Sequence, residues 1–415
     1  MLRKIEFQNW KSFRNSKLYI DQLTVLIGTN ASGKSNALDA LEFLSRIAAS
    51  RDISTALSGD ATLDGVRGQI EWAAYRGEPR FTLKVLIGTD DEKTDYEYSI
   101  SIFLSEGNAE LEGEELVRVK YQGENPRRLR LFWTDQPRQN EPGIVARLYN
   151  TKSGTKKPLR RNLSILSQLE LDPTLKKEIA QGVDVVSQNL RGIFILDPDP
   201  TRVRGFSRLN ENLKKDGSNI AGVLMALPEA NRDKITKKIT QLAAQIPEKD
   251  IKRVWAEFVG RHKADAMLYC SEEWTSGEEF EVDARGMSDG TLRFIIVIGA
   301  MLIRPEGSTL VIEEIDNGLH PSRALLLLKA IKEIASERKI DLLITTHNVA
   351  LLDALPPSLI RSISVATRSD DEGSSVIASL DDVPLLARMI AEGEVGTLAK
   401  KGRIEETLKH HLNNA

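Results

Sequence analysis

The chain has 415 residues, of which 41% are hydrophobic and 28% charged, so it is long enough for two or three domains with buried cores, or for one domain with a large insertion. The net charge of −3 gives no overall basic field for nucleic acid, and the single cysteine, Cys270, excludes a disulfide framework and fits a reducing compartment. The N-terminus lacks the apolar core of a signal peptide, and no apolar run approaches the roughly 18 residues of a membrane span. We therefore expect a cytoplasmic protein with no membrane partner.

The first 28 residues alternate between polar and apolar side chains, as strands do. Leu2, Ile5 and Phe7 predict a first strand, a polar turn is expected over 9–17, and a second strand follows at 18–20. A β-branched, apolar run over 23–27 then predicts a buried strand. The N-terminal segment should therefore end in a strand that leads directly into the loop at residue 28.

Residues 28–35 read GTNASGKS and match the phosphate-binding P-loop, G-x-x-x-x-G-K-[ST]. Gly28 and Gly33 allow the backbone to bend so that successive N–H groups point at phosphates. Lys34 should reach the β- and γ-phosphates, and the Ser35 hydroxyl should ligate Mg²⁺. Apolar residues at helical spacing over 36–49 predict the helix behind the loop, so this segment should bind ATP with Mg²⁺.

Residues 66–121 have the alternation of β-strands, with turns between them. Strands are predicted over 68–75, 80–88, 96–105 and 114–123. We expect an antiparallel β subdomain beside the P-loop sheet.

The stretch 117–161 holds twelve Lys or Arg residues and only three Asp or Glu residues. A solvated, loop-rich face is one interpretation, and a surface that contacts nucleic-acid phosphates through Arg127, Arg128 and Arg130 is the other. The next block, 161–265, looks mainly helical and is expected to form an insertion or lid outside the central sheet, before strand-like alternation returns over 266–283.

Two features that can bind anions or activate water follow. Ser288 and Gly290 open an apolar helix, and a Ser-x-Gly at a helix start can form an anion-binding nest. An apolar strand over 308–312 then ends in Glu313 and Glu314, which a parallel sheet would place beside the P-loop. Because adjacent strand residues point in opposite directions, Glu313 is expected on the Mg²⁺ side and Glu314 on the attacking water.

Another buried strand is predicted over 341–345, and it leads into Thr346 and His347. A single histidine is usually structural or exposed. This one should lie beside Glu314, where it could hydrogen-bond the γ-phosphate or orient the water.

Taken together, these motifs resemble an ABC-type ATPase head of the SMC, RecF and OLD kind, and more narrowly the stand-alone bacterial branch of predicted AAA family ATPases. The resemblance covers residues 1–115 and 280–370, reaches Asp216 to Asn219, and extends to the tail over 390–409 with Gly393 and Gly396. It implies an α/β P-loop NTPase fold with four parts. These are an N-terminal head lobe over 1–115, a basic and mainly helical insertion over 116–280, a C-terminal head lobe over 281–370 and a tail over 371–415.

The resemblance also implies roles. Two heads would sandwich two ATP molecules, with Ser288 and Gly290 of one subunit capping the γ-phosphate bound by the other. Glu313 matches the Walker B acid, Glu314 the catalytic carboxylate and His347 the switch histidine. The remaining matches are the D-loop residue Asp316 and the nucleotide-binding set Gly28, Asn30, Gly33, Lys34, Ser35 and Asn36.

The sequence departs from the family pattern at several positions. Glu313 replaces the more usual Asp, and Met287 stands where the signature usually has Leu. The Q-loop glutamine is not identifiable, with Gln69 as a candidate, and no heptad run is long enough for coiled-coil arms. The tail is too short for a Toprim nuclease, so any nuclease activity would need a partner chain.

Four functions can be considered for these motifs, and the first two fit them best. The first is an ATP-dependent homodimeric switch that regulates a separately encoded effector, such as a nuclease or toxin, in phage defence; this step rests on analogy. The second is a DNA-binding repair ATPase similar to RecF. A transporter ATPase subunit fits the large insertion poorly, and a non-enzymatic scaffold would not need Glu314.

Overall fold

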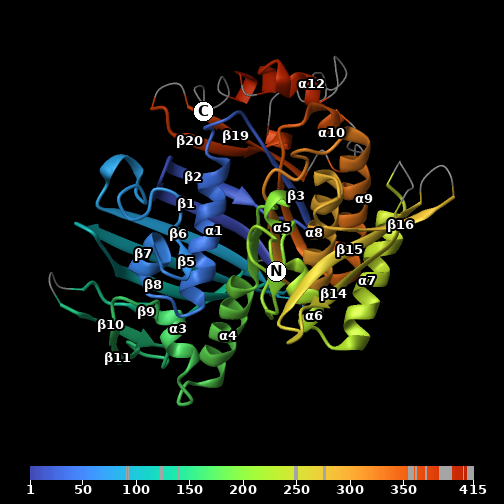
Figure 1. The fold of residues 1–415 in the computed structure, drawn as a ribbon. Helices are drawn as coiled ribbons and strands as arrows, with labels where there is room; N and C mark the ends of the chain where they lie inside the picture. Colours follow the sequence, from blue (N-terminus) through green and yellow to red (C-terminus); the bar gives the residue numbers. More distant parts are fainter. Residues whose placement is uncertain are drawn as a thin grey trace.

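The structure is a computed structural model that describes the chain except for residues 90, 92, 122–124, 138–140, 247–250, 274–276, 354–358, 360–361, 370–371, 383–394, 405 and 409–415. Two large sheets lie on either side of one helix, α1 (Lys34–Ala48) (Figure 1). Leu38, Leu41 and Leu44 of α1 belong to a single buried cluster with residues of both sheets. The helix behind the P-loop is therefore fixed from two sides.

The central sheet has the strand order β12-β17-β18-β3-β19-β20, in which all neighbours are parallel except the last pair. Its strands are β3 (Leu23–Ile27), β12 (Ile193–Leu196), β17 (Thr309–Ile312), β18 (Asp341–Thr345), β19 (Ile363–Arg368) and β20 (Ser375–Ser379). Every residue of β3, β17 and β18 is buried. Continuous apolar runs are what a parallel sheet covered on both faces requires, and the predicted α/β P-loop fold is confirmed.

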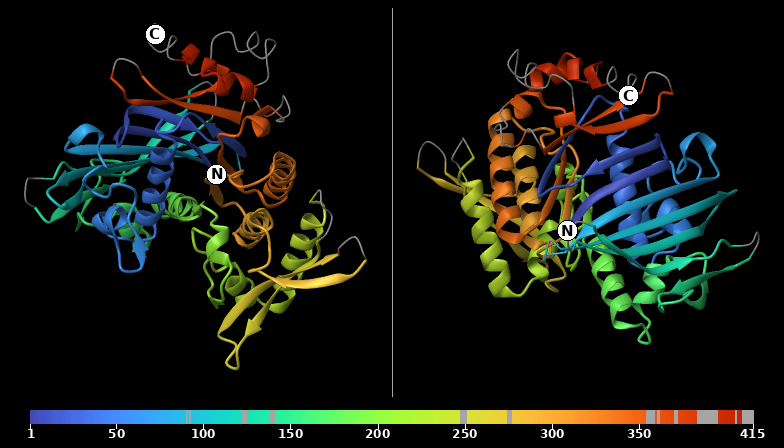
Figure 2. Two further views of the ribbon diagram at one scale, coloured as in Figure 1. Left: turned by 45° about the horizontal axis from the view of Figure 1, so that its top comes forward. Right: turned by 180° about the vertical axis from the view of Figure 1, so that it is seen from behind.

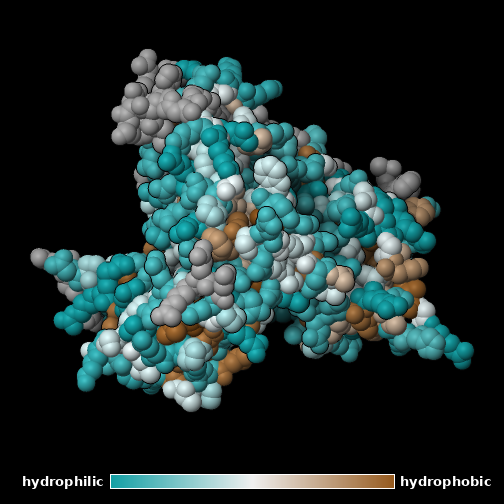
Figure 3. All heavy atoms as spheres, turned by 90° about the vertical axis from the view of Figure 1, so that its left-hand side faces the viewer, coloured by the Kyte–Doolittle hydropathy of each residue, from teal (hydrophilic) through white to brown (hydrophobic). Residues whose placement is uncertain are grey.

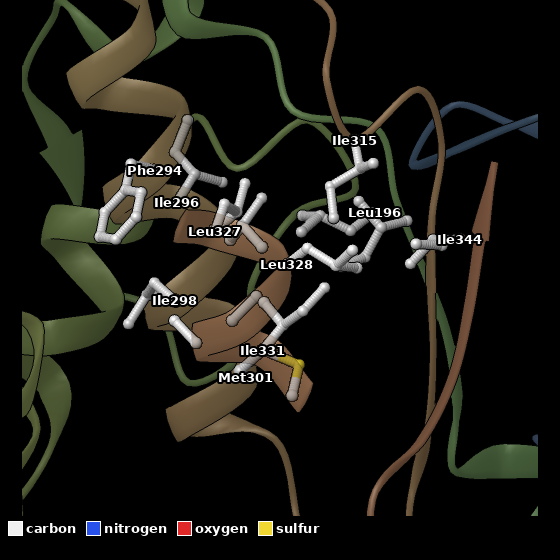
Figure 4. Packing of buried hydrophobic residues seen from close by; sticks show 14 of the residues in the cluster. Leu196, Phe294, Ile296, Ile298, Met301, Ile315, Leu327, Leu328, Ile331 and Ile344 are labelled. Atoms are coloured by element: carbon white, nitrogen blue, oxygen red, sulfur yellow. The ribbon is translucent and has the colours of Figure 1, made fainter. Parts of the chain in front are cut away.

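Helices α8 (Asp289–Ile303) and α9 (Pro321–Arg338) cover the other face of the central sheet. Figure 4 shows Phe294 and Met301 of α8 and Leu327 and Ile331 of α9 in the same buried cluster as Ile344 of β18. Because this face is apolar and tightly covered, the polar ends of the strands are confined to the sheet edge.

The second sheet is antiparallel and has the order β11-β10-β9-β8-β7-β6-β1-β2. Its strands are β1 (Leu2–Trp10), β2 (Phe13–Tyr19), β6 (Arg80–Gly88), β7 (Thr94–Ser105), β8 (Asn108–Lys120), β9 (Arg127–Thr134), β10 (Gly143–Leu148) and β11 (Thr155–Arg160). The predicted antiparallel subdomain is present. The basic stretch after residue 117 extends this sheet, and the prediction of a loop-rich face there is wrong.

Two local predictions need correction in this half of the molecule. The turn expected over 9–17 is much shorter, because Phe13 and Ser16 are buried in β2 and continue the alternation. The strand expected over 68–75 is instead a series of turns, since Gly68 and Gln69 both have positive φ. The segment around it contains α2 (Ile53–Ser58), β4 (Gly59–Asp60), β5 (Leu63–Asp64) and the 3₁₀ turn η1 (Tyr75–Gly77).

Residues 116–280 alternate helices and strands, so the description as mainly helical is corrected. The elements are α3 (Ile165–Glu170), α4 (Lys177–Arg191), α5 (Pro200–Val203), β13 (Ser207–Arg208), α6 (Ile220–Ala226), α7 (Glu229–Ala243), β14 (Ile251–Val259), β15 (Asp265–Glu273) and β16 (Glu279–Asp283). Moreover, β12 from this block belongs to the central sheet. Figure 2 shows the small sheet of β14 to β16 projecting with α7 beside it.

The boundaries expected at 115/116 and 280/281 fall inside β8 and β16. The short helix α10 (Val349–Asp353) follows β18, and the described part of the tail includes β20, η3 (Leu380–Asp382) and α12 (Val395–Lys400). Part of the tail resemblance, including Gly393, lies outside the described residues. On the face in Figure 3, hydrophilic residues cover most of the surface and hydrophobic ones form a few separate patches. Within the described residues, no helix is long and apolar enough to cross a membrane.

Candidate active site

The P-loop joins the carboxyl end of β3 to the start of α1. Gly33 is the N-cap residue of α1 and supplies no side-chain cap, so the N–H groups of the first helical turn are open to an external acceptor. Thr29, Asn30 and Ala31 are exposed at the tip of the loop. This is the geometry that an anionic phosphate requires.

Both P-loop glycines are needed where they stand. Gly28 has φ +147°, and a Cβ there would lie 2.3 Å from the carbonyl oxygen of Ala366. Gly33 has φ +110°, and a Cβ there would lie 2.6 Å from the Ser375 hydroxyl. Any side chain at either position would therefore push the loop away from β19 and β20.

Two side chains of the P-loop make contacts within the site. The Lys34 ammonium donates to the carbonyl oxygens of Gly28, over 2.6 Å, and Thr29, over 3.0 Å, so it lies along the inside of the loop. The Ser35 hydroxyl donates to Oε1 of Glu313 over 3.1 Å. A hydroxyl and a carboxylate brought together beside a phosphate loop form an oxygen-only ligand pair, which fits Mg²⁺.

Neighbouring segments brace the loop. The Asn36 side-chain amide donates to the Ser12 hydroxyl over 2.7 Å, which ties α1 to the β1–β2 turn. From the other side, Nε of Arg368, at the end of β19, donates to the Ala31 carbonyl over 2.8 Å. Asn36, predicted to bind nucleotide, therefore has a structural contact here, and Arg368 is a P-loop neighbour that the sequence reasoning missed.

Glu313 and Glu314 lie in the turn that follows β17, one and two residues beyond the strand. Their surroundings differ because Glu314 has φ +47°, a left-handed conformation that is uncommon for a residue with a side chain. Glu313 turns to Ser35, whereas the nearest recorded partner of the Glu314 carboxylate is the Asn317 amide at 3.3 Å. The two acids thus make different contacts, but both lie beyond β17, so strand alternation is not the reason for the difference.

The strand next to these acids is β18, which pairs with β17 on one side and β3 on the other. His347 follows its end and is exposed. The structure thus places His347 at the end of the strand that lies between the P-loop strand and the strand before Glu314.

The expected signature residues lie at the start of α8. The Ser288 hydroxyl accepts the Thr291 N–H over 3.1 Å and also a hydrogen bond from Arg323 over 3.2 Å. Ser288 is exposed, Gly290 is buried, and Asp316 is only 5% exposed. In this chain, therefore, Ser288 faces outward, whereas the predicted D-loop carboxylate is enclosed.

A buried arginine connects this helix to the turn that holds Glu313 and Glu314. Arg293 of α8 donates to the Glu314 carbonyl over 3.1 Å and to the Pro198 carbonyl over 2.8 Å. Its partner loop begins at Asp197, which follows β12 as Glu313 follows β17. Burial, and then the nearby charge of Glu313, raise the pKa of Asp197 above its usual value. Asp197 directly follows the short apolar run of β12, and this position in the sequence could have marked it as a site residue.

Arg67 is the other residue that the sequence reasoning missed. Its guanidinium contacts both carboxylate oxygens of Glu313, over 2.9 Å and 2.6 Å. Nothing in its local sequence marks it, because its partner is 246 positions away. Gln69, the Q-loop candidate, is exposed two residues further along the same turn.

The expected nucleic-acid contacts lie on the outer face of the antiparallel sheet. Arg128 of β9 pairs with Glu97 of β7, two strands away in the sheet, and Arg130 pairs with Glu115 of β8 over 2.5 Å. Among the described residues, six of the twelve cations of the basic stretch form ion pairs: Arg118, Arg128, Arg130, Arg147, Lys157 and Arg161. The charge excess in the sequence is thus partly neutralised by acids from other segments.

Comparisons with known proteins agree with this architecture. The family described as "AAA domain, putative AbiEii toxin, Type IV TA system" matches residues 23–353. No curated protein matches the sequence. Among solved structures, the crystal structure of an SMC head bound to the C-winged helix domain of ScpA is 14% identical and has a TM-score of 0.53, with 92% of this chain and 98% of that chain covered.

Two further SMC heads are similar at lower scores. The SMC head domain from Thermotoga maritima is 14% identical, with 91% of this chain and 98% of that chain covered and a TM-score of 0.42. The SMC head with an extended coiled coil, bound to the C-terminal domain of ScpA and derived from Pyrococcus furiosus, is 13% identical. The match covers 94% of this chain and 99% of that chain and has a TM-score of 0.46. The family match spans most of the sequence, and the ScpA-bound head of higher score shares the fold of this chain, so this chain belongs to that AAA-domain family and has the P-loop fold of an SMC head.

Proposed function

We propose that this protein is a molecular switch that binds ATP, closes into a head-to-head homodimer around two ATP molecules, and opens when they are hydrolysed. The observation that carries the proposal is the convergence of the P-loop, Glu313, Glu314 and His347 on the carboxyl edge of three adjacent parallel strands. Ligands of open α/β sheets bind at this edge.

Within one subunit, the N–H groups of the P-loop and the Lys34 ammonium bind the phosphates. Ser35 and Glu313 would hold Mg²⁺, which neutralises charge on the β- and γ-phosphates when bound. Glu314 orients the attacking water and His347 donates a hydrogen bond to the γ-phosphate. Because phosphoryl transfer depends mostly on positioning and charge neutralisation, these residues are sufficient for hydrolysis once the site is closed.

The second subunit completes the site. The exposed Ser288, at the N-terminus of a 15-residue helix, supplies a hydroxyl and a positive helix end to the γ-phosphate of its partner. Gly290 has no side chain to block the close approach of the partner's γ-phosphate. Asp316, the D-loop residue, would reach the subunit interface after a small opening of its turn. The proposal predicts that isolated monomers bind ATP but hydrolyse it slowly.

The switch would act on a separately encoded effector, such as a nuclease or a toxin, in defence against phage. The family description, which names a toxin of a toxin–antitoxin system, supports a regulatory setting, as does the ScpA-bound state of a structure with the same fold. Co-purification of an effector chain that dissociates when ATP is hydrolysed tests this part of the proposal.

The enzymatic part is tested by Lys34→Ala. Wild-type protein with Mg²⁺ should release phosphate from ATP at a specific rate that increases with protein concentration, because the site needs two subunits. The variant should lose both phosphate release and binding of a fluorescent ATP analogue. Turnover that is independent of protein concentration, or that survives Lys34→Ala, contradicts the proposal.

A DNA-binding repair ATPase similar to RecF is the alternative, and the basic strands favour it. Changing Arg127, Arg128 and Arg130 to Glu should then weaken binding to duplex DNA and flatten its dependence on salt. The ion pairs of Arg128 and Arg130 reduce the charge available for such binding. No binding by the wild type at low salt eliminates this alternative.

A further inference from the structure

Arg67 occupies the side of Glu313 that the bound metal ion would use. Nη2 of Arg67 lies 2.9 Å from Oε1 and 2.6 Å from Oε2 of Glu313. The same Oε1 accepts the Ser35 hydroxyl over 3.1 Å. The two groups expected to hold Mg²⁺ are thus already in contact with a cation of the chain itself.

The position of Arg67 is set by a buried ion pair behind it. The Lys11 ammonium donates to the backbone carbonyl of Arg67 over 2.6 Å and pairs with Asp39 over 2.5 Å. The side chains of Lys11 and Asp39 are only 4% and 2% exposed. Because this pair is fixed, it holds the turn of Arg67 against α1 whatever the guanidinium does.

The guanidinium itself has other carboxylates within reach. Its Nη1 lies 3.7 Å from Oδ1 of Asp39. It also borders a cavity of about 880 Å³ whose lining combines acids, including Asp64, Asp197 and Asp199, with bases, including Arg202, Lys215 and Arg293. The Arg67 side chain is 45% exposed, so its pair with Glu313 is weaker than a fully buried one and can open.

We propose that Arg67 is a latch that competes with Mg²⁺ for Glu313, and that binding of the metal–nucleotide complex releases it toward Asp39 and the carboxylates that line this cavity. The inference rests on the proposed ATP site. Two positive charges repel one another on a single carboxylate, so metal binding and the Arg67–Glu313 pair exclude each other. The apparent affinity for the metal is then reduced by the fraction of molecules in which the latch is closed.

The opposite role is that Arg67 orients Glu313 while the metal binds through water. The two roles predict opposite changes in the Mg²⁺ requirement when Arg67 is removed. Removing a latch lowers the Mg²⁺ concentration needed for nucleotide binding, whereas removing an orienting residue raises it.

The test is a Mg²⁺ titration of the affinity for a fluorescent ATP analogue, in wild type, Arg67→Gln, Arg67→Lys and Arg80→Gln. Arg80→Gln is the matched control, because it removes the same charge from an exposed ion pair with Glu112 on the antiparallel sheet. Arg67→Gln should lower the half-saturating Mg²⁺ concentration about fivefold, without changing nucleotide affinity in EDTA. Arg67→Lys, which keeps the charge but loses the planar guanidinium, should shift it less and in the same direction.

Fluorescence of Trp72 gives a readout that does not depend on turnover. Trp72 is 73% exposed and lies five residues after Arg67 in the same turn. Its emission, read as the difference from a Trp72→Phe variant, should change on addition of Mg²⁺ and nucleotide in wild type and not in Arg67→Gln. An unchanged or higher Mg²⁺ requirement in both Arg67 variants overturns the latch, whereas a wild type that binds no nucleotide at any Mg²⁺ concentration overturns the proposed ATP site instead.

Discussion

The backbone N–H of Glu314 donates a hydrogen bond to the hydroxyl of Thr345 over 2.9 Å. Thr345 is the last residue of β18 and is only 2% exposed. The bond crosses between neighbouring strands and fixes a residue whose φ is +47°. The position of the proposed catalytic carboxylate therefore depends on a side chain that touches no substrate.

Thr345→Val keeps the shape of the side chain and removes the acceptor. Leaving the Glu314 N–H unpaired costs about 1–3 kcal/mol, and the left-handed turn should relax. We expect ATP turnover to fall about tenfold or more while affinity for the ATP analogue stays within about twofold. Thr309→Val is the control, since Thr309 is equally buried in β17 and its change should leave turnover intact. Equal effects of the two substitutions would show that the loss reflects packing alone.

The composite site predicts complementation between two inactive variants. Lys34→Ala lacks a working P-loop and Ser288→Arg lacks a working signature, so neither should hydrolyse ATP alone. An equal mixture should recover about a quarter of wild-type turnover, because about half of the dimers are mixed and each holds one complete site. A mixture as inactive as its components, although mixed dimers form, would argue that Ser288 acts within its own subunit or that both sites must work together.

A buried carboxylate gives a pH prediction that concerns stability alone. Glu114 accepts the backbone N–H groups of Ile165 and Leu166, over 2.6 Å and 2.8 Å, and the Tyr98 hydroxyl over 2.9 Å. Burial raises its pKa to about 7. The folded state holds the proton more tightly than the unfolded state, so this group stabilises the fold below about pH 4.5 and loses that contribution as pH rises toward 7.

Glu114→Gln removes the titration but also loses one acceptor for the start of α3. At pH 5 the variant should be less stable by about 1–3 kcal/mol in urea unfolding. The gap between wild type and variant should then narrow as the pH is raised to 8. A gap that stays constant or widens would mean that Glu114 is not protonated in the fold.

The parts of the site that lie on long apolar strands could be predicted from sequence. β17 and β18 are continuous buried runs, so Glu314 and His347 were placed by the position at which each run ends. Ser288 was similarly marked by the helix that follows it. These signals are local, and the sheet topology only brings them together.

The predictions that failed concern residues whose structure depends on partners far away in the sequence or on unusual backbone conformations. The alternation over 68–75 looked like a strand, but positive φ at Gly68 and Gln69 turns the chain and presents Arg67 to Glu313. β12 is only four residues long and could not be told from a helix by periodicity. The cations of the basic stretch looked unbalanced because most of the acids that pair with them lie outside it.

The central claim is that ATP closes two copies of this chain around Ser288, and Glu314→Gln tests it most directly. The substitution should keep nucleotide binding but block hydrolysis, so the closed state accumulates. With ATP and Mg²⁺, light scattering on a sizing column should give twice the mass seen with ADP, and adding Ser288→Arg to the same chain should abolish the difference. Glu306→Gln, at an exposed acid, should behave as wild type. A mass for Glu314→Gln that is the same with ATP and with ADP, together with undiminished hydrolysis, would contradict the account.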